Sequence, residues 1–478
     1  MKRLAGQAGL QDLVSSTADL VEYFRNDTLA PHAKHRTHLT PVPAEETNWR
    51  DEQRAWRETA ILFNQSFHMP ELFVRGRDAF KLLNYVGINT FDKFVPGRAK
   101  SFLGCAPNGH VIGECLLHQH GTDDFELISG QYLINWVQYL AETRDYDVTT
   151  RLDHAIWDHP TGCRVNFRFG LDGPHAGAIF DEAVDGESPE IPFFRTAHVA
   201  IAGKPVFCLR HGMAGHAGVE LSGAFADLQT VRDRLIQVGR RHGLKLGGTR
   251  TYFSTLGEEG WFPYPLPAIY TGEEMRPFRE WLSTDSWEAK AQIGGSFVSR
   301  NIEDYYVTPW DLNLARLMKF DHDFVGRASL EKMAKESHRQ KVTLVLATED
   351  VQRVFASLYG PGLPYKFMDM PTAHYAMQQA DEVRSLDGGL IGLSSFCGYT
   401  INEKAWLCLA LVNEQDARVG GDVVLVWGEP NGGTRKPHVE QHRQVEIRAT
   451  IAPCPYAKAV QELQHATIGK PMEAAPRR

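Results

Sequence analysis

The sequence predicts an α+β protein with two antiparallel α/β lobes followed by a C-terminal β-barrel. Through the first two thirds of the chain, strand patterns joined as hairpins alternate with amphipathic helices, which favours antiparallel lobes over a parallel doubly wound sheet. After about residue 340, short strands separated by glycine-rich turns replace the helical periodicity, which is typical of a small barrel. The 478 residues suffice for about three domains at ~150 residues each.

The first elements are helical. A short helical stretch is expected near residues 13–24, within an otherwise irregular segment 1–45. Apolar and packing residues then recur at steps of three and four from Trp49 to Phe63, which predicts a helix over 49–63.

Two hairpins and two helices follow. Residues 111–118 and 125–129 are apolar strand patterns on either side of a Gly-Thr-Asp-Asp turn, and a helix is expected over 132–142. A second hairpin is expected over 199–209, followed by an amphipathic helix over 228–238 with Gly243 as its C-cap. The predicted barrel strands are 342–347, 389–395, 406–412, 423–427 and 445–451.

Composition excludes several classes of protein. The 51 basic and 59 acidic side chains leave a net charge of −8, which gives no general attraction to nucleic acid. The longest apolar run, Ala405–Val412, is far shorter than the ~18 residues of a membrane span, and the N-terminal segment lacks the apolar core of a secretion signal. Seven cysteines without a Cys-x-x-Cys predict reduced thiols. We therefore expect a cytoplasmic protein that binds neither membrane nor nucleic acid.

Familiar catalytic motifs are absent from the sequence. It contains no Gly-x-Gly-x-x-Gly, no P-loop, no Gly-x-Ser-x-Gly and no His-Glu-x-x-His. These absences weaken nicotinamide-dependent, kinase, hydrolase and zinc-protease functions.

His118-Gln119-His120 is the pattern most similar to a metal site, because residues two apart on a strand share a face. Polar residues are nevertheless expected beside the turn at Asp123 and Asp124, and a metal also needs a third ligand. We interpret the pair as a solvated hairpin end and expect no metal.

Other polar residues leave two interpretations open. A basic stretch contains His32, His35 and His38 together with Lys34 and Arg36. It is either a solvated stretch or a cationic wall for an anionic substrate. His68, between apolar neighbours, is a core histidine or a functional one. Further candidates follow glycine-rich segments or strands: Glu220, Arg250, Tyr252 and Trp261.

In their order along the chain, several segments resemble the folate-binding aminomethyltransferase family of the glycine cleavage system. The resemblance covers roughly residues 45–455 and rests on segments 49–69, 109–114, 218–221, 248–250 and 319–327. It implies a folate-binding module over 1–335, with an inner lobe at about 75–158 and an outer lobe from 1–74 and 159–335. The barrel would then occupy 336–478.

Within that family, longer segments look like the tetrahydrofolate-dependent O-demethylases of lignin-derived methoxybenzoates. They are segments 210–215, 266–272, 294–299, 301–307 and 427–436. The resemblance implies transfer of an O-methyl group to N5 of tetrahydrofolate. Compared with vanillate-type relatives, Ser129-Gly130 and His38-Leu39-Thr40-Pro41 look smaller or differently charged, which favours syringate, with its second methoxy group, over vanillate. Vanillate, 3-O-methylgallate and an amine substrate remain alternatives.

The resemblance also implies roles for individual residues. Tyr252 and His68 would serve the leaving oxygen, because a phenol or an imidazolium can donate a proton there. Glu220 would hold the pterin, with Glu114, Arg250 and Trp261 as further tetrahydrofolate contacts. His38 or Arg36, with His35 as a further choice, would hold the substrate carboxylate. No obligate protein partner is expected.

Overall fold

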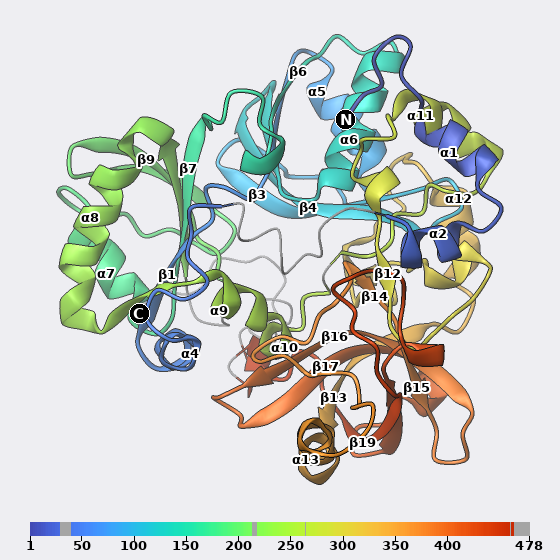
Figure 1. Cartoon of the computed structure of the whole chain (residues 1–478). Helices are drawn as coiled ribbons and strands as arrows, with labels where there is room; N and C mark the ends of the chain where they lie inside the picture. The colour runs from blue at the N-terminus through green and yellow to red at the C-terminus, as the bar shows by residue number, and fades with distance from the viewer. Residues whose placement is uncertain (29–39, 213–217, 263, 459, 463–478) are drawn as a thin grey trace.

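The computed structural model describes residues 1–28, 40–212, 218–262, 264–458 and 460–462, which form three lobes around a common centre (Figure 1). One lobe contains a five-stranded sheet, the second a six-stranded sheet, and the third a closed six-stranded barrel. A parallel pair of two-residue strands, β12 (Ile293–Gly294) and β14 (Gln378–Gln379), joins segments that are distant in the sequence.

The five-stranded sheet is antiparallel and carries two long helices. Its strand order is β3 (Arg98–Cys105), β4 (Val111–Gly121), β5 (Asp124–Ile128), β2 (Glu71–Arg75) and β6 (Thr149–Asp153). Apolar faces of α5 (Ala79–Val86) and α6 (Gln131–Thr143) share its core. The N-terminal helices α1 (Leu10–Ser16) and α2 (Leu20–Asn26) pack into the same core, as does α11 (Arg276–Trp281).

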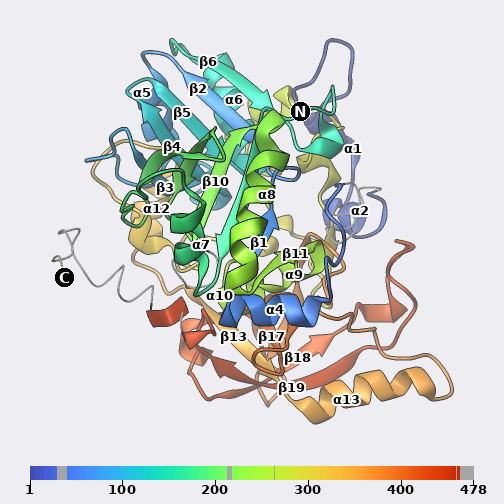
Figure 2. The same ribbon diagram turned by 90° about the vertical axis from the view of Figure 1, so that its left-hand side faces the viewer.

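The six-stranded sheet is covered by α7 (Ala176–Ala183) and α8 (Leu228–Gly239), which lie side by side in Figure 2. Its strand order is β11 (Leu244–Gly247), β1 (Ala60–Asn64), β7 (Asn166–Asp172), β10 (Val219–Ala224), β9 (Lys204–Leu209) and β8 (Thr196–Ile201). All neighbours are antiparallel except β1 and β11. Helix α4 (Trp49–Glu58) contacts β1 and β11 and leads directly into β1.

The barrel closes in the order β13 (Arg339–Leu346), β17 (Ala405–Asn413), β16 (Leu390–Thr400), β15 (Asp381–Arg384), β18 (Asp422–Trp427) and β19 (Val445–Ala452), with β19 returning to β13. Helix α13 (Thr348–Ala356) lies at its outer side (Figure 1). Among the described residues, the remaining α-helices are α9 (Thr249–Ser254), α10 (Leu256–Glu259) and α12 (Arg327–Met333). Short 3₁₀ helices occupy 156–158, 225–227, 240–242, 273–275, 288–290, 302–305, 315–317, 357–359, 414–416 and 430–432.

The structure confirms the α+β class, the antiparallel hairpins and the C-terminal barrel. Both predicted hairpins form, and Gly243 adopts the left-handed conformation (φ 74°) after the 3₁₀ extension of α8. The prediction of a helix through residue 63 is wrong. Helix α4 ends at Glu58, because residues 60–64 instead pair with both β11 and β7 as an almost wholly buried strand. A strand buried on both faces has no alternation, so its apolar run resembled a continuing helix.

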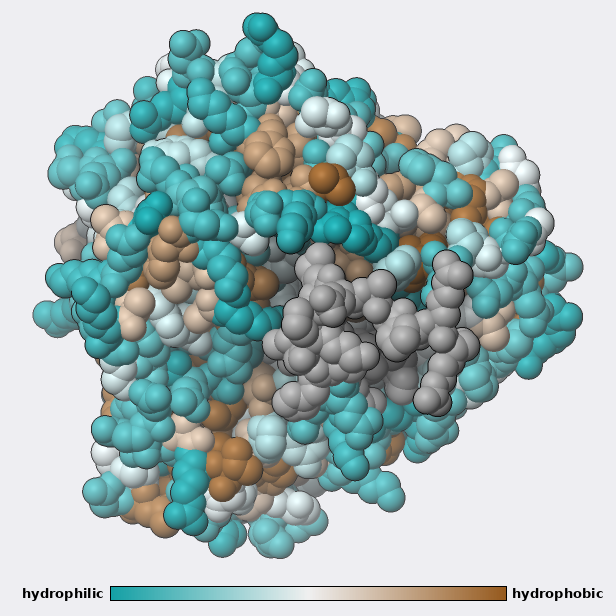
Figure 3. All heavy atoms as spheres, turned by 180° about the vertical axis from the view of Figure 1, so that it is seen from behind, coloured by the Kyte–Doolittle hydropathy of each residue, from teal (hydrophilic) through white to brown (hydrophobic). Residues whose placement is uncertain are grey.

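The domain boundaries predicted from the sequence stay a prediction. Residues 266–306 and the N-terminal helices contribute to the core of the five-stranded lobe, which links distant segments of the expected module. Figure 3 shows that hydrophilic residues dominate the rear face, with apolar residues in small separate patches. Among the described residues, no helix is both long enough and apolar enough to span a membrane.

Candidate active site

A cavity of about 90 Å³ lies where the lobes meet. The end of β1, the start of α6 and helix α9 supply much of its wall, and Met377 contributes from the segment before β14. Its lining is mainly apolar and aromatic: Thr40, Val42, Phe63, Asn64, His68, Pro70, Ser129, Gly130, Gln131, Trp157, Gly247, Gly248, Thr249, Tyr252, Phe253, Tyr264, Trp287 and Met377. Such a lining with few polar groups is typical of a site for a small aromatic ligand.

Glu52 fixes the start of the helix that carries Tyr252. The buried carboxylate accepts hydrogen bonds from the Gly248 N–H (2.9 Å) and the Thr251 hydroxyl (2.6 Å). Position 248 requires glycine, because a Cβ there would collide with the carbonyl oxygen of Ala44. Glu52 therefore positions α9 at the cavity wall.

Tyr252 projects into an aromatic corner of the cavity. The rings of Phe63 and His68 lie 5.2 and 5.0 Å from its ring, both edge-on. The Gln65 amide donates to its hydroxyl at 3.4 Å. Burial, followed by the nearby charge of Glu220, raises the pKa of Tyr252 well above its ordinary value. Tyr252 is therefore a phenol with a proton to donate at neutral pH.

The surroundings of His68 favour the neutral imidazole over the imidazolium expected from the sequence, and its role at the leaving oxygen stays a prediction. Burial, assisted by the positive charge of Arg164, lowers the pKa of His68 to about 4. Its Nε2 is buried and has no hydrogen-bond partner among the described residues. Arg164 also donates to the carbonyls of Ser66 (3.0 Å) and Met69 (2.7 Å) and thereby fixes the segment that carries His68.

Glu220 and His211 form a charged pair at the end of the β9–β10 connection. The His211 Nδ1 lies 2.9 Å from the Glu220 Oε1. Burial alone would raise the pKa of Glu220, but the His211 hydrogen bond and the charges of His211 and Arg168 lower it. Burial alone would lower the pKa of His211, but the Glu220 hydrogen bond and charge raise it. The pair therefore keeps an ionised carboxylate near Tyr252.

The other predicted cofactor residues occupy different surroundings. Glu114, on β4, accepts a hydrogen bond from Ser101 and adds negative charge near His211. Arg250, on α9, pairs with Glu45 and donates to the Met370 carbonyl. Trp261 is 43% exposed, and its ring lies 6.5 Å from that of Tyr264, which lines the cavity.

The structure thus brings Tyr252 and His68 together. It places Glu220 within electrostatic reach of Tyr252, whereas Arg250 does not line the cavity. The candidates His35, Arg36 and His38 lie outside the described residues.

Sequence reasoning missed several cavity residues. Asn64 lines the cavity, and the next residue, Gln65, bonds to Tyr252. Both follow the apolar residues of β1, and this abrupt change to amides in a largely buried segment was the available signal. Trp157 lies in the 3₁₀ helix 156–158 and Trp287 directly precedes the one at 288–290, yet their rings lie 6.0 Å apart. No local pattern could have paired them.

The interpretation of His118-Gln119-His120 as a solvated hairpin end is wrong for His118. Strand β4 continues to Gly121, and the His118 side chain is 1% exposed. Its ring lies 5.3 Å from that of Phe207, which comes from the six-stranded sheet. Contact between the two lobes removes this histidine from water.

Comparison with known proteins assigns the family. The family model described as the GCVT N-terminal domain matches residues 19–265. The chain is 44% identical to a syringate O-demethylase from Sphingobium sp. over 448 residues, which covers 94% of this chain and 96% of that protein. The chain belongs to the GCVT family.

Two other proteins are similar to this chain at lower identity. A sesamin methylene transferase from Sinomonas sp. is 29% identical over 87% of this chain and 90% of its own length. The crystal structure of the glycine cleavage system aminomethyltransferase T from Bartonella henselae superimposes with a TM-score of 0.59, covering 92% of this chain and 96% of that one at 15% identity. The GCVT-family chain described here therefore shares the aminomethyltransferase fold over nearly its whole length.

Proposed function

We propose that this protein transfers the O-methyl group of a methoxybenzoate to N5 of tetrahydrofolate, with syringate as the expected substrate. The products are the free phenol and 5-methyltetrahydrofolate. The observation that carries the proposal is the 44% identity, over nearly the full length of both chains, to a syringate O-demethylase.

The cavity supports an aromatic substrate. Its aromatic walls include Trp157 and Trp287, and Tyr252 and His68 are among its polar residues. Gly130 and Gln131 add the start of α6, a 13-residue helix without an acidic residue in its first turn. Unpaired N–H groups and the helix dipole favour an anion there, such as the substrate carboxylate. Arg36 or His38 would supply further positive charge.

The donor and acceptor set fits tetrahydrofolate. A pterin presents an amino group and ring N–H groups, for which carboxylates are the matching acceptors. Glu220 is ionised and retains acceptor capacity beyond its bond to His211, and Glu114 lies near His211. We infer that Glu220 and Glu114 hold the pterin and that Trp261 flanks the cofactor. Arg250 could contribute only by exchanging Glu45 for a cofactor carboxylate.

When bound, tetrahydrofolate supplies the nucleophilic nitrogen that accepts the methyl group. Phenolate is a poor leaving group from carbon, so the chain must stabilise the charge that develops on the aryl oxygen. Tyr252 donates its phenolic proton to that oxygen. Neutral His68 has one N–H and one acceptor nitrogen. It orients the substrate ring through an oxygen substituent next to the reacting methoxy group. The apolar walls hold the substrate in line and exclude water.

We also propose that the protein acts in the cytoplasm without an obligate protein partner. All seven cysteines are free thiols, five of them buried, which supports a reducing compartment.

The proposal is tested by incubating purified protein anaerobically with tetrahydrofolate and one of three substrates: syringate, vanillate or 3-O-methylgallate. Mass spectrometry should detect 5-methyltetrahydrofolate and the demethylated phenol in equal amounts, with syringate the fastest. Folate binding without loss of any aryl methyl group would contradict the proposal and favour an amine substrate instead.

A further inference from the structure

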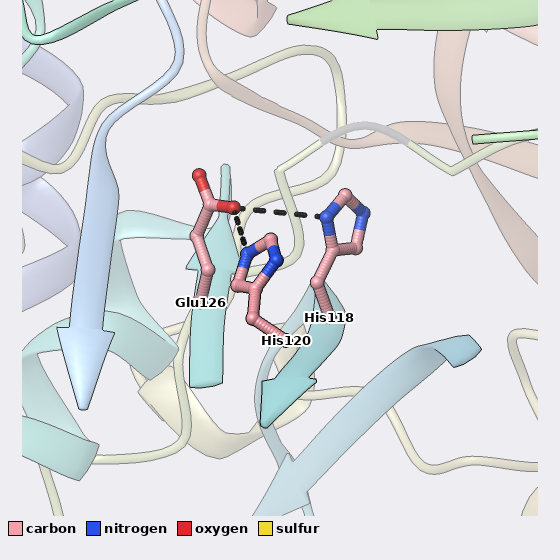
Figure 4. A group of neighbouring side chains, drawn as sticks. All are labelled: His118, His120 and Glu126. Carbon is pink, nitrogen blue, oxygen red and sulfur yellow. Dashed lines mark hydrogen bonds and ion pairs between the residues drawn. The ribbon is translucent and has the colours of Figure 1, made fainter. Parts of the chain in front are cut away.

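A cluster of two histidines and a glutamate lies outside the residues that line the cavity (Figure 4). His118 and His120 are two residues apart on β4, so both side chains lie on one face of the sheet. Glu126 faces them from β5, where it is the direct register partner of His118. The three residues offer one ligand atom each, and these atoms all lie within 4.8 Å of one another.

The separations suit a small divalent ion. The Glu126 Oε2 lies 2.8 Å from the His120 Nε2 and 3.7 Å from the His118 Nδ1. Ligands of a tetrahedral zinc ion lie at about 2.0–2.2 Å from the metal and therefore roughly 3.3 Å from one another. The two separations from Glu126 lie on either side of this value.

The two ring nitrogens of His118 need a hydrogen-bond or metal partner. Its side chain is 1% exposed, and neither ring nitrogen has a hydrogen-bond partner among the described residues. A buried polar group without a partner is costly and calls for an occupant that the protein atoms alone do not supply.

The surrounding charges also favour a cation. Arg168 donates to both Glu71 and Glu126, while Arg164 pairs with Asp153. Two guanidinium groups face these three carboxylates, so the cluster holds no excess of positive charge that would repel a cation. Because Arg168 binds the Oε1 of Glu126, the Oε2 is left facing the two histidines. A hydrogen bond of this kind orients a ligating carboxylate.

We propose that His118, His120 and Glu126 bind one divalent transition-metal ion of the zinc class. Two imidazoles and one carboxylate match zinc and its neighbours rather than magnesium or calcium, which prefer oxygen ligands. Phe207 of β9 covers the site, with its ring 4.8 Å from that of His120 and 5.3 Å from that of His118. The His120 side chain is 26% exposed and leaves a route for the ion and an open position for water.

The bound ion would join β4 to β5 where the two α/β lobes meet. This inference goes beyond the proposed methyl transfer, which requires no metal, and its test does not depend on that reaction. It also differs from the expectation drawn from the sequence, in which this pair was solvated.

The experiment uses the full-length protein, freed of any histidine tag and dialysed against a chelator. Isothermal titration with Zn²⁺ should show one tight ion per chain. His120→Asn should weaken this binding by about 100-fold or more, because loss of a ligand exceeds the 10–100-fold typical of an outer-sphere partner. The matched control is His198→Asn. His198 is exposed and its ring lies 5.2 Å from the same Phe207, so the control should bind like the wild type.

A second measurement uses the wild type alone and so does not depend on the variant folding. NMR of the Co²⁺-loaded protein should show hyperfine-shifted ring N–H signals from two histidines. Absence of stoichiometric binding, equal binding by His120→Asn and the wild type, or a Co²⁺ spectrum with fewer than two histidine signals would each overturn the proposal.

Discussion

His68 lines the cavity and His211 bonds to Glu220 near Tyr252, yet the pKa values of the two histidines move in opposite directions. His68 lies in an aromatic corner and has no carboxylate partner in the part of the chain that the structure describes, and burial lowers its pKa to about 4. His211 bonds to Glu220, and that carboxylate raises its pKa although burial acts against it. Tyr252 resembles His68, because burial is the largest cause of its raised pKa.

The difference separates two tasks within one site. Burial keeps Tyr252 and His68 uncharged, which suits proton donation and contact with an aromatic ring. Ion pairing keeps Glu220 charged, which suits the binding of N–H donors. The predictions below test this division between a neutral side and a charged side.

The largest effect is expected from Tyr252→Phe on the neutral side. Loss of the phenolic proton should lower turnover of syringate by about 10²-fold or more, because a positioned general acid contributes this much. Tetrahydrofolate affinity should not change. Tyr359→Phe is the control, since Tyr359 is 92% exposed. Single-turnover kinetics would measure the chemical step, and a rate within a factor of three of the wild type would exclude Tyr252 as the donor.

On the charged side, Glu220→Ala should weaken tetrahydrofolate binding by about 2 kcal/mol, or roughly thirtyfold in Kd. The loss reflects pterin donors left without their acceptor. Anaerobic titration calorimetry measures the affinity, with the exposed Glu187→Ala in the same lobe as control. Wild-type affinity in Glu220→Ala would place the pterin elsewhere.

Much of the fold could be predicted because its signals are local. The hairpins at 111–128 and 196–209 and the barrel strands each carry their own alternation and turn residues. The error at residues 60–64 arose where that alternation disappears, because β1 is buried between two neighbouring strands. Short β15 also escaped notice, since its four residues are mostly polar.

The candidate site could be predicted only in part, because its properties depend on contacts between distant segments. Nothing beside Arg250 in the sequence indicates Glu45 as its partner. The charge state of His68 depends on burial and on Arg164, about a hundred residues away. Likewise His118 is buried through Phe207, which belongs to another sheet. The sequence indicated which residue types carry chemistry but not their ionisation.

The pH dependence of stability distinguishes the effect of His68 from that of His211. His68 binds its proton more weakly in the folded than in the unfolded protein. As the pH falls from 6.5 to 4, this difference progressively lowers the free energy of unfolding. Between pH 7 and pH 5 this loss should reach about 1–2 kcal/mol, and His68→Asn should abolish it. His211 acts oppositely: its stabilising effect is fully present below pH 6.5 and is lost as the pH rises through its higher folded pKa.

Urea unfolding of the wild type and His68→Asn at pH 5, 6 and 7 measures this difference. His198→Asn removes an exposed histidine and should follow the wild type. If His68→Asn loses as much stability on acidification as the wild type, His68 is not held neutral by the fold.

The smallest effect is expected at Trp261. The indole is 43% exposed and lies near Tyr264, which lines the cavity, so it can flank a flat ligand without being needed for the fold. Trp261→Leu should weaken tetrahydrofolate binding by about 1 kcal/mol, roughly fivefold in Kd, because aromatic contacts contribute this much beyond simple burial. Trp261→Phe should recover part of the lost affinity. Val298→Leu, at an apolar position of similar exposure, is the control and should leave the affinity for tetrahydrofolate unchanged. Equal affinity in Trp261→Leu and the wild type would remove Trp261 from the cofactor site and leave the carboxylates as the proposed pterin contacts.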